Sequence, residues 1–164
     1  MASPRFSKES TPRPAIDPAI AALRVPPHSI EAEQSVLGGL LLDNNAWDKI
    51  GDVVSESDFY RDEHRRIFRA IQKLMERSKP ADVITVSEAL ENAGDKDSTG
   101  GLAYVSELAS NVPGASNIRR YAEIVRERAV LRQLVTAGDE ISESALNPMG
   151  RDTTTLLDEA EQKV

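Results

Sequence analysis

The chain has 164 residues, of which 40% are hydrophobic, 29% are charged and only 4% are aromatic. This length suits one domain with its own core, alone or with an extension, and a core that must rest on aliphatic side chains favours packed helices over a sheet sandwich. The absence of cysteine excludes disulfides and thiolate metal sites, and the net charge of −7 argues against duplex DNA as the main ligand.

The beginning of the chain is predicted to be a tail. Its first residues, MASPRFSKES, lack the apolar stretch of a secretory signal peptide. No apolar run anywhere approaches the ~20 residues that a membrane-spanning helix needs, so we expect a cytoplasmic protein without a membrane partner. Residues 1–27 hold six of the nine prolines and show no apolar periodicity. Such a segment buries too little apolar surface to offset its ordering entropy, which predicts a disordered tail over residues 1–27.

Residues 28–115 carry the patterns of a globular helical head. Ser29 is placed as an N-cap, with Glu31 and Glu33 in the first turn of the helix that follows. The apolar face of this helix has helical spacing: Val36, Leu37, Leu40 and Leu41. The Gly38–Gly39 pair in mid-helix costs ~1 kcal/mol per residue relative to alanine. The pair therefore predicts the close approach of a neighbouring backbone.

A short helix near residues 45–54 and a longer one from about Asp62 to Arg77 are predicted next, both with apolar faces for the same core. The aromatic residues of this region, Trp47, Phe59 and Phe68, are expected to pack there. The longer helix also carries cations at a spacing of four: Arg61, Arg65, Arg69, Lys73 and Arg77. Like charges at this spacing weaken a helix slightly, which favours an opposing acidic surface. An ordinary solvated face is an equally good interpretation.

Two further helices complete the predicted head. Thr85–Glu88 has the form of a capping box, and Gly94 suits the end of the helix that it would start. The last helix of the head follows Gly100–Gly101 and stops before Pro113. Tyr104 is adjacent to its apolar stripe, so this residue is either a peripheral core residue or a contact for a partner.

The last third of the chain predicts an antiparallel helical hairpin over residues 116–164. From 117 to about 146 nothing breaks the helical pattern, which gives a rod of roughly 45 Å at 1.5 Å per residue. A turn at 147–150 and a cap at Asp152 precede a second helix over about 153–164. Two helices cannot cover their own apolar faces, so the hairpin should contact another copy or another protein. The amphipathic pattern runs to Val164 without a cap, which favours a longer natural polypeptide.

The chain carries no recognisable catalytic motif. The patterns GxxxxGK[ST] and GxGxxG, which cradle phosphates, are absent. His28 falls at the entry to the first helix and His64 is predicted on a helix surface, and neither has a histidine or glutamate four residues on. We therefore expect no metal, no cofactor and no catalytic residue. Catalysis through His64 beside Asp62 and Glu63 remains a remote alternative.

Four long segments follow one another in unbroken order: PPHSIEAEQSVLGGLLLDNNAWDKI (26–50), DFYRDEHRRIFRAI (58–71), PADVITVSEAL (80–90) and GGLAYVSELASNVPGASNIRRYAEIVRERAVLRQLV (100–135). They resemble the N-terminal domain of bacterial replicative DNA helicases of the DnaB type, over roughly residues 24–164. The resemblance implies a helical head and hairpin that precede a linker helix and a RecA-like ATPase motor. ATP and Mg²⁺ would belong to that motor, which this sequence lacks.

The resemblance also implies partners. In that family six copies form a collar, a trimer of dimers joined through the hairpins, which docks the C-terminal helicase-binding domain of primase. A helicase loader is a further candidate partner. We expect contacts from apolar hairpin residues that a compact head cannot cover: Val135, Ile141 and Leu156, with Leu131, Leu134 and Leu157. The resembling segments add Tyr104 and Asp82 from the head. Ordinary packing or turn roles are the alternative for each of these residues.

A second hypothesis is a helical nucleic-acid-binding domain that uses the Arg61–Arg77 ladder. The distribution of charge counts against it. Residues 61–80 carry a net +4, but they lie between residues 29–60, at −6, and residues 81–116, at −5. Alternating patches of this kind suit a surface that meets other proteins, so we expect little direct DNA binding.

Overall fold

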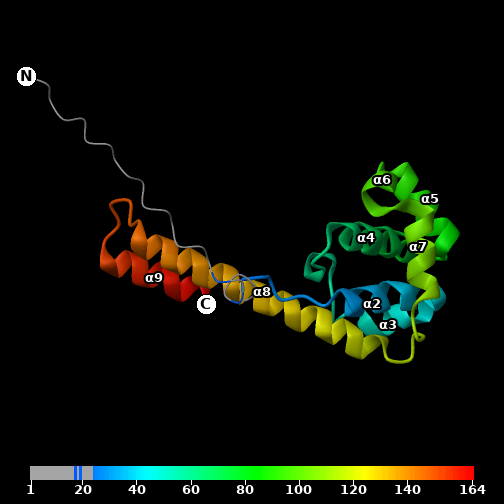
Figure 1. Ribbon diagram of the computed structural model, residues 1–164, viewed down its shortest axis with the longest axis horizontal. Coiled ribbons are helices and arrows are strands. Elements are labelled where there is room, and N and C mark those ends of the chain that lie inside the picture. Colours follow the sequence, from blue (N-terminus) through cyan, green and yellow to red (C-terminus); the bar gives the residue numbers. More distant parts are fainter. Residues whose placement is uncertain (1–16, 18, 20–23) are drawn as a thin grey trace, which may run out of the picture.

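The computed structural model describes residues 17, 19 and 24–164, and every regular element among them is helical. The all-α class predicted from the sequence is thereby confirmed. The predicted tail over residues 1–27 lies outside the described residues, apart from 17, 19 and 24–27. Figure 1 shows a head of packed helices at one end of the molecule and a long helix that leaves it, with a shorter helix folded back beside its far end.

The central helix of the head is α2 (Ile30–Leu42), which Ser29 caps by accepting a hydrogen bond from the Ala32 N–H at 3.3 Å. It packs against α4 (Asp62–Glu76), α7 (Gly101–Ser110) and the first part of α8 (Ile118–Leu146). The glycine pair makes this possible. A Cβ on Gly38 would lie 2.2 Å from the Leu108 carbonyl oxygen of α7, and one on Gly39 would lie 3.0 Å from Ile118 Cδ1. The predicted close approach of a neighbouring backbone is confirmed.

Short helices surround this centre: η1 (Asn44–Ala46), α3 (Trp47–Ile50), η2 (Glu56–Asp58), α5 (Val83–Asn92) and α6 (Lys96–Thr99). The single helix predicted near residues 45–54 is therefore wrong in its extent. The Asp43 carboxylate caps η1 by accepting from the Asn45 N–H at 3.0 Å, and the chain leaves α3 through a turn at residues 51–53. This turn lets Val54 enter the core.

The predicted capping box at Thr85–Glu88 is also wrong, because α5 begins earlier. Its N-cap is Asp82, whose carboxylate accepts from the Thr85 N–H at 2.8 Å, while the Thr85 hydroxyl accepts from the Asp82 N–H at 2.9 Å. Aspartate is as good an N-cap as threonine, and the earlier start adds most of a turn of helix. The end of α5 is as predicted, since Gly94 follows it with a φ of +77°.

The core of the head is aliphatic around one aromatic cluster. The ring centroids of Phe59 and Phe68 lie 4.9 Å apart, and those of Trp47 and Phe68 lie 5.4 Å apart. Phe59 and Phe68 are fully buried, and Trp47 packs against them, as predicted. Such tilted pairs add roughly 0.5–1.5 kcal/mol each beyond the area that they bury.

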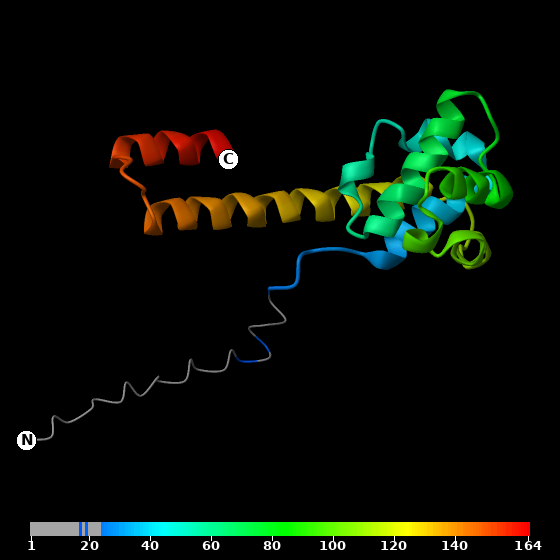
Figure 2. The same ribbon diagram turned by 90° about the horizontal axis from the view of Figure 1, so that it is seen from above.

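The long helix α8 belongs to the head for its first half only. Its buried residues are Ile118, Ala122, Val125 and Ala129, which share one face. Beyond Ala129 the helix leaves the head, and α9 (Thr153–Lys163) returns antiparallel beside its end (Figure 2). Lys163 Nζ reaches Glu140 Oε2 at 3.2 Å across the two helices. Among the residues described, no helix combines the length and the apolarity needed to traverse a lipid bilayer.

Two arginines brace the rod against the head. Arg126 Nη1 lies 2.7 Å from the carboxylate of the buried Asp58. Arg132 donates to the carbonyl oxygens of Asp58 and Pro27, at 2.5 and 2.7 Å, and its guanidinium lies 5.5 Å from the centre of the Tyr60 ring. These contacts fix the direction in which α8 leaves the head.

Candidate partner-binding surface

The free half of α8 exposes a set of large apolar side chains. Leu131, Leu134 and Val135 are 41, 57 and 50% exposed. At 3.6 residues per turn these positions lie on the side of α8 away from Val125 and Ala129, which pack against the head. On α9, Leu157 is 61% exposed. We call these four residues the hairpin surface. Large apolar side chains that are exposed in this number typically mark a site of association.

Two of the predicted hairpin contacts have a different position. Ile141 and Leu156 are only half-exposed, and both line a groove of about 390 Å³ between α8 and α9. The groove is also lined by Ala145, Leu157 and Ala160. Ile141 and Leu156 therefore help to hold α9 on α8, and Leu157 lines the same groove, whereas Leu131, Leu134 and Val135 do not line it.

The two predicted contacts in the head lie far from the hairpin. Asp82 is exposed and caps α5, and Tyr104 is half-buried on α7. Figure 1 places α5 and α7 at the end of the molecule opposite to α9. The structure therefore places the six hairpin residues on α8 and α9, where Ile141, Leu156 and Leu157 line one groove, and leaves Tyr104 and Asp82 on a separate part of the surface.

A buried polar network in the head was missed by the sequence prediction. His64, placed on a helix surface by that prediction, is 0% exposed, and Glu33 is 1% exposed. Nδ1 of His64 donates to Glu33 Oε1 at 2.8 Å, and Nε2 shares a hydrogen bond of 2.7 Å with the Tyr104 hydroxyl. Glu33 also accepts from the backbone N–H groups of Tyr60 and Arg61, at 2.9 and 3.3 Å.

His64 is buried for a physical reason that can be read from its position in the helix. His64 shares a helix face with Ile67, Phe68 and Ile71, and this face is buried. Glu33 likewise shares the face of Val36 and Leu37. Both ring nitrogens of His64 are engaged within the core, so no substrate can reach this histidine. The network joins the start of α4 to α2 and is structural.

Most of the predicted basic ladder is neutralised by nearby carboxylates. Arg61 pairs with Glu63 at 3.4 Å, Arg65 with Asp62 at 3.6 Å, and Arg69 with Glu56 of η2. Hydrogen bonding to Arg66 holds the pKa of Asp62 below its usual range. The expected opposing acidic surface is therefore a few local carboxylates rather than one patch.

The cap of α9 makes the end of the hairpin sensitive to acid. The Asp152 carboxylate accepts from the Thr155 N–H at 2.8 Å, and this bond, with the Thr155 hydroxyl, lowers the pKa of Asp152. A lowered pKa stabilises the folded state above the usual aspartate range, and this stabilisation is lost as pH falls through the lowered value. We expect the protection of the Thr155 amide against deuterium exchange, relative to an unfolded peptide at the same pH, to fall below about pH 4, the usual aspartate range. In the Asp152→Ala variant the Thr155 amide should exchange fast at neutral pH too. Equal protection in the variant and the wild type at neutral pH would contradict the cap.

Together these features describe an all-helical domain, in which a packed head carries a hairpin with exposed apolar side chains. The family model for the DnaB-like helicase N-terminal domain matches residues 25–127. The chain therefore belongs to this family, which confirms the resemblance noted in its sequence.

Individual relatives agree with this assignment. The chain is 47% identical, over 148 residues, to the replicative DNA helicase DnaB of Haemophilus influenzae, covering 90% of this chain and 32% of that protein. It also matches the crystal structure of the N-terminal domain of DnaB helicase from Mycobacterium tuberculosis, with 38% identity, a TM-score of 0.82, and coverage of 85% of this chain and 97% of that one. The chain thus spans about a third of the length of the curated relatives.

A further solved structure is described by its interactions with primase. It is the N-terminal domain of DnaB helicase from Helicobacter pylori, which matches with 25% identity and a TM-score of 0.62, over 71% of this chain and 90% of that one.

Proposed function

We propose that this chain is the collar domain of a hexameric replicative helicase, which self-associates through its hairpin and docks primase. The observation that carries the proposal is the hairpin surface, Leu131, Leu134, Val135 and Leu157, exposed on a rod that leaves the head. We assign ATP, Mg²⁺ and unwinding to the part of the helicase that this chain does not span. A helicase loader stays a candidate partner.

Self-association through the hairpin has a sufficient driving force. Burying a leucine or valine side chain is worth roughly 1.5–3 kcal/mol, so the four residues of the hairpin surface offer several kcal/mol to an interface. Two copies of a helical hairpin can pack isologously, with the same surface used by both, which gives a closed dimer. The rod holds this surface clear of the head, so two copies can meet without a clash of their heads (Figure 1).

Primase docking rests on the Helicobacter pylori relative, whose N-terminal domain is described with its interactions with primase. Within this chain, the hairpin surface and the separate head positions Tyr104 and Asp82 are the contacts that we propose. Asp82 is exposed, and the Tyr104 hydroxyl already bonds to His64 and Gln34, so only the rest of its ring is available to a partner.

A nucleic-acid-binding role is disfavoured by the ion pairs of the ladder. Arg61, Arg65 and Arg69 each have a carboxylate partner, and Arg66 has two, Asp62 and Asp95. Neutralised cations release few counterions on binding phosphates, which removes most of the driving force for non-specific DNA binding.

The experiment is sedimentation equilibrium of the chain alone and then with the C-terminal domain of primase. We expect the wild type to associate with increasing concentration and to form a heavier species with primase. Leu134→Asp/Val135→Asp should weaken self-association by roughly 100-fold or more, because two apolar contacts are lost and two charges are placed in the interface.

The matched control for this variant is Leu102→Asp, which changes an exposed leucine of the head. It should associate like the wild type. Because Leu134 and Val135 lie beyond the last buried residue of α8, the unfolding transition of the head should be unchanged in the double variant. A wild type that stays monomeric at all concentrations and ignores primase would contradict the proposal, as would a double variant that associates normally.

A further inference from the structure

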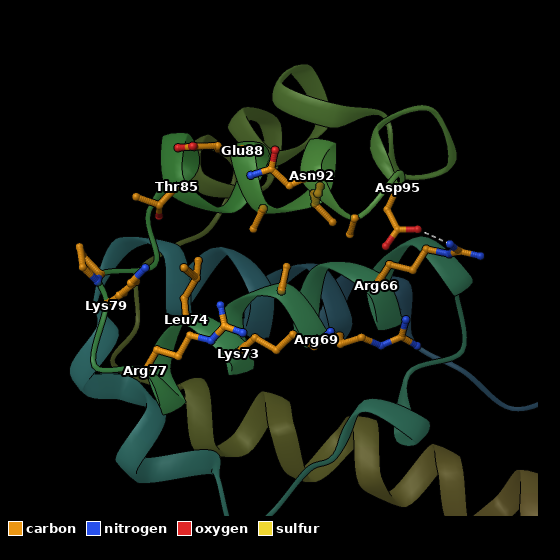
Figure 3. A pocket seen from close by; sticks show the side chains of 15 residues that line it. Arg66, Arg69, Lys73, Leu74, Arg77, Lys79, Thr85, Glu88, Asn92 and Asp95 are labelled. Carbon is orange, nitrogen blue, oxygen red and sulfur yellow. Dashed lines mark hydrogen bonds and ion pairs between the residues drawn. The ribbon is translucent and has the colours of Figure 1, made fainter.

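A groove of about 730 Å³ separates α4 from α5 in the head. Figure 3 shows the side chains of α4 along one wall and those of α5 along the other. The residues that line it come from both helices and from the loop between them. The groove lies at the end of the molecule opposite to α9, so it is separate from the hairpin surface (Figure 1).

The α4 wall is strongly basic. Arg66, Arg69, Lys73 and Arg77 recur at intervals of three and four residues and therefore share one helix face, and Lys79 of the loop extends this row. Arg66 and Arg69 are paired with Asp95 and Glu56. Lys73, Arg77 and Lys79 have no carboxylate partner within residues 24–164, and all three are exposed. This end of the groove thus presents three uncompensated cations in a chain whose net charge is −7.

The floor of the groove is apolar and made largely of small side chains. Ala70 and Leu74 contribute from α4, Ala89 from α5, and Ala93 from the residue that follows α5. Alanine at these positions leaves room between the helices for a larger apolar side chain from outside. The α5 wall adds Asn92, whose side-chain amide can bond to peptide groups.

We propose that this groove binds an acidic peptide segment of a partner protein, with one or two large apolar side chains seated between α4 and α5 and carboxylates on Lys73, Arg77 and Lys79. The charge of the row and the apolar floor together select this chemistry. Neither feature alone would select an acidic and apolar peptide. A site that bound its partner by charge alone would not require the apolar floor, and a purely apolar site would not require the cations.

Nucleic acid fits the groove less well. Its lining contains no aromatic side chain on which a base could stack, and stacking supplies much of the affinity for single strands. The opposite wall carries Glu88, whose carboxylate would repel a phosphate backbone that fills the groove. A peptide can place its carboxylates on the α4 side alone and avoid this repulsion.

The test is fluorescence anisotropy of the full chain with a short, fluorescein-labelled peptide of alternating aspartate and leucine. We expect saturable binding that weakens between about 0.05 and 0.3 M salt, because the screening length of exposed ion pairs shortens over this range, from roughly 14 Å to roughly 6 Å. Lys73→Glu/Arg77→Glu should weaken binding at least about tenfold. Ala93→Trp, which fills the groove without a change of charge, should weaken binding as well.

The matched control is Lys49→Glu/Lys96→Glu, which makes the same change of net charge with two exposed lysines that do not line the groove. It should bind like the wild type. Self-association measured by sedimentation should be unchanged in Lys73→Glu/Arg77→Glu, so the test is independent of the proposed function of the hairpin. Peptide binding that is absent, or unchanged in both groove variants, overturns the proposal. Stronger binding of oligothymidine than of the peptide overturns it too.

Discussion

Replacement of Gly38 by alanine is expected to destabilise the head by about 3 kcal/mol, although alanine is the better helix former by ~1 kcal/mol. The new Cβ would lie 2.2 Å from the Leu108 carbonyl oxygen and 2.4 Å from Val112 Cγ2. The nearer of these atoms belongs to the backbone of α7, so the clash can be relieved only by moving α7 away from α2. The free energy of unfolding, measured by urea titration at one fixed protein concentration, checks this result.

The chain offers a matched control in Gly138→Ala. Gly138 also lies inside a helix, but a Cβ there would meet nothing within 4 Å. This substitution should stabilise the protein by roughly 0.5–1 kcal/mol through helix propensity alone. The opposite signs of the two glycine substitutions would identify the contact between α2 and α7 as the cause. A Gly38→Ala protein as stable as the wild type would show that these helices do not approach so closely.

His64→Ala is expected to cost about 3–5 kcal/mol, because it removes one partner of a buried, hydrogen-bonded pair and leaves a cavity. The Glu33 carboxylate would keep its two backbone donors, the N–H groups of Tyr60 and Arg61, but lose the imidazole at 2.8 Å. Both side chains are almost wholly buried, so solvent cannot replace the lost hydrogen bond without opening the core. Urea titration again provides the measurement.

A smaller change within the same network tests how much the Tyr104 hydroxyl contributes to stability compared with the Glu33–His64 pair. Tyr104→Phe removes only the hydroxyl that bonds to His64 Nε2 and Gln34 Nε2, and it should cost about 1 kcal/mol. A double-mutant cycle of Glu33→Gln with His64→Ala should show a coupling well above 0.5 kcal/mol. Additive effects in this cycle would mean that Glu33 and His64 do not stabilise each other.

The fold could be predicted from local patterns wherever the apolar face of one helix is enough to define that helix. The apolar spacing around residues 36–41 predicted the central helix, the Gly38–Gly39 pair within it predicted the close approach of a neighbour, and the unbroken pattern after residue 117 predicted the long rod. Local patterns do not define where a helix begins when two neighbouring residues are both suitable N-caps. Asp82 and Thr85 are both good N-cap residues, and in the structure Asp82 takes this place while Thr85 completes the capping box from its third position.

The buried polar network could not be predicted from the spacing of residues within a single helix. Glu33 and His64 lie 31 positions apart in the chain, and no local rule pairs them. Each does occupy a helix face of buried aliphatic residues, and this shared feature is the signal that could have found them. At the hairpin, periodicity identified the apolar residues but not their neighbours. Only the placement of α9 separates Ile141 and Leu156, which line the groove between the helices, from the exposed Leu134 and Val135.

Because α8 is one continuous helix, a small change in its angle to the head would move the far end of the hairpin by several ångströms. Residues 130–146 extend about 26 Å beyond the head at 1.5 Å per residue, so a tilt of about 10° at Ala129 would move the Leu146 end by roughly 4–5 Å, close to one helical turn. Arg126 and Arg132 resist such a tilt, and both bind Asp58, one through its carboxylate and the other through its carbonyl oxygen. Asp58 is therefore a shared anchor of both arginines, and a change in the angle between head and hairpin would disturb its bonds together with the bond from Arg132 to Pro27.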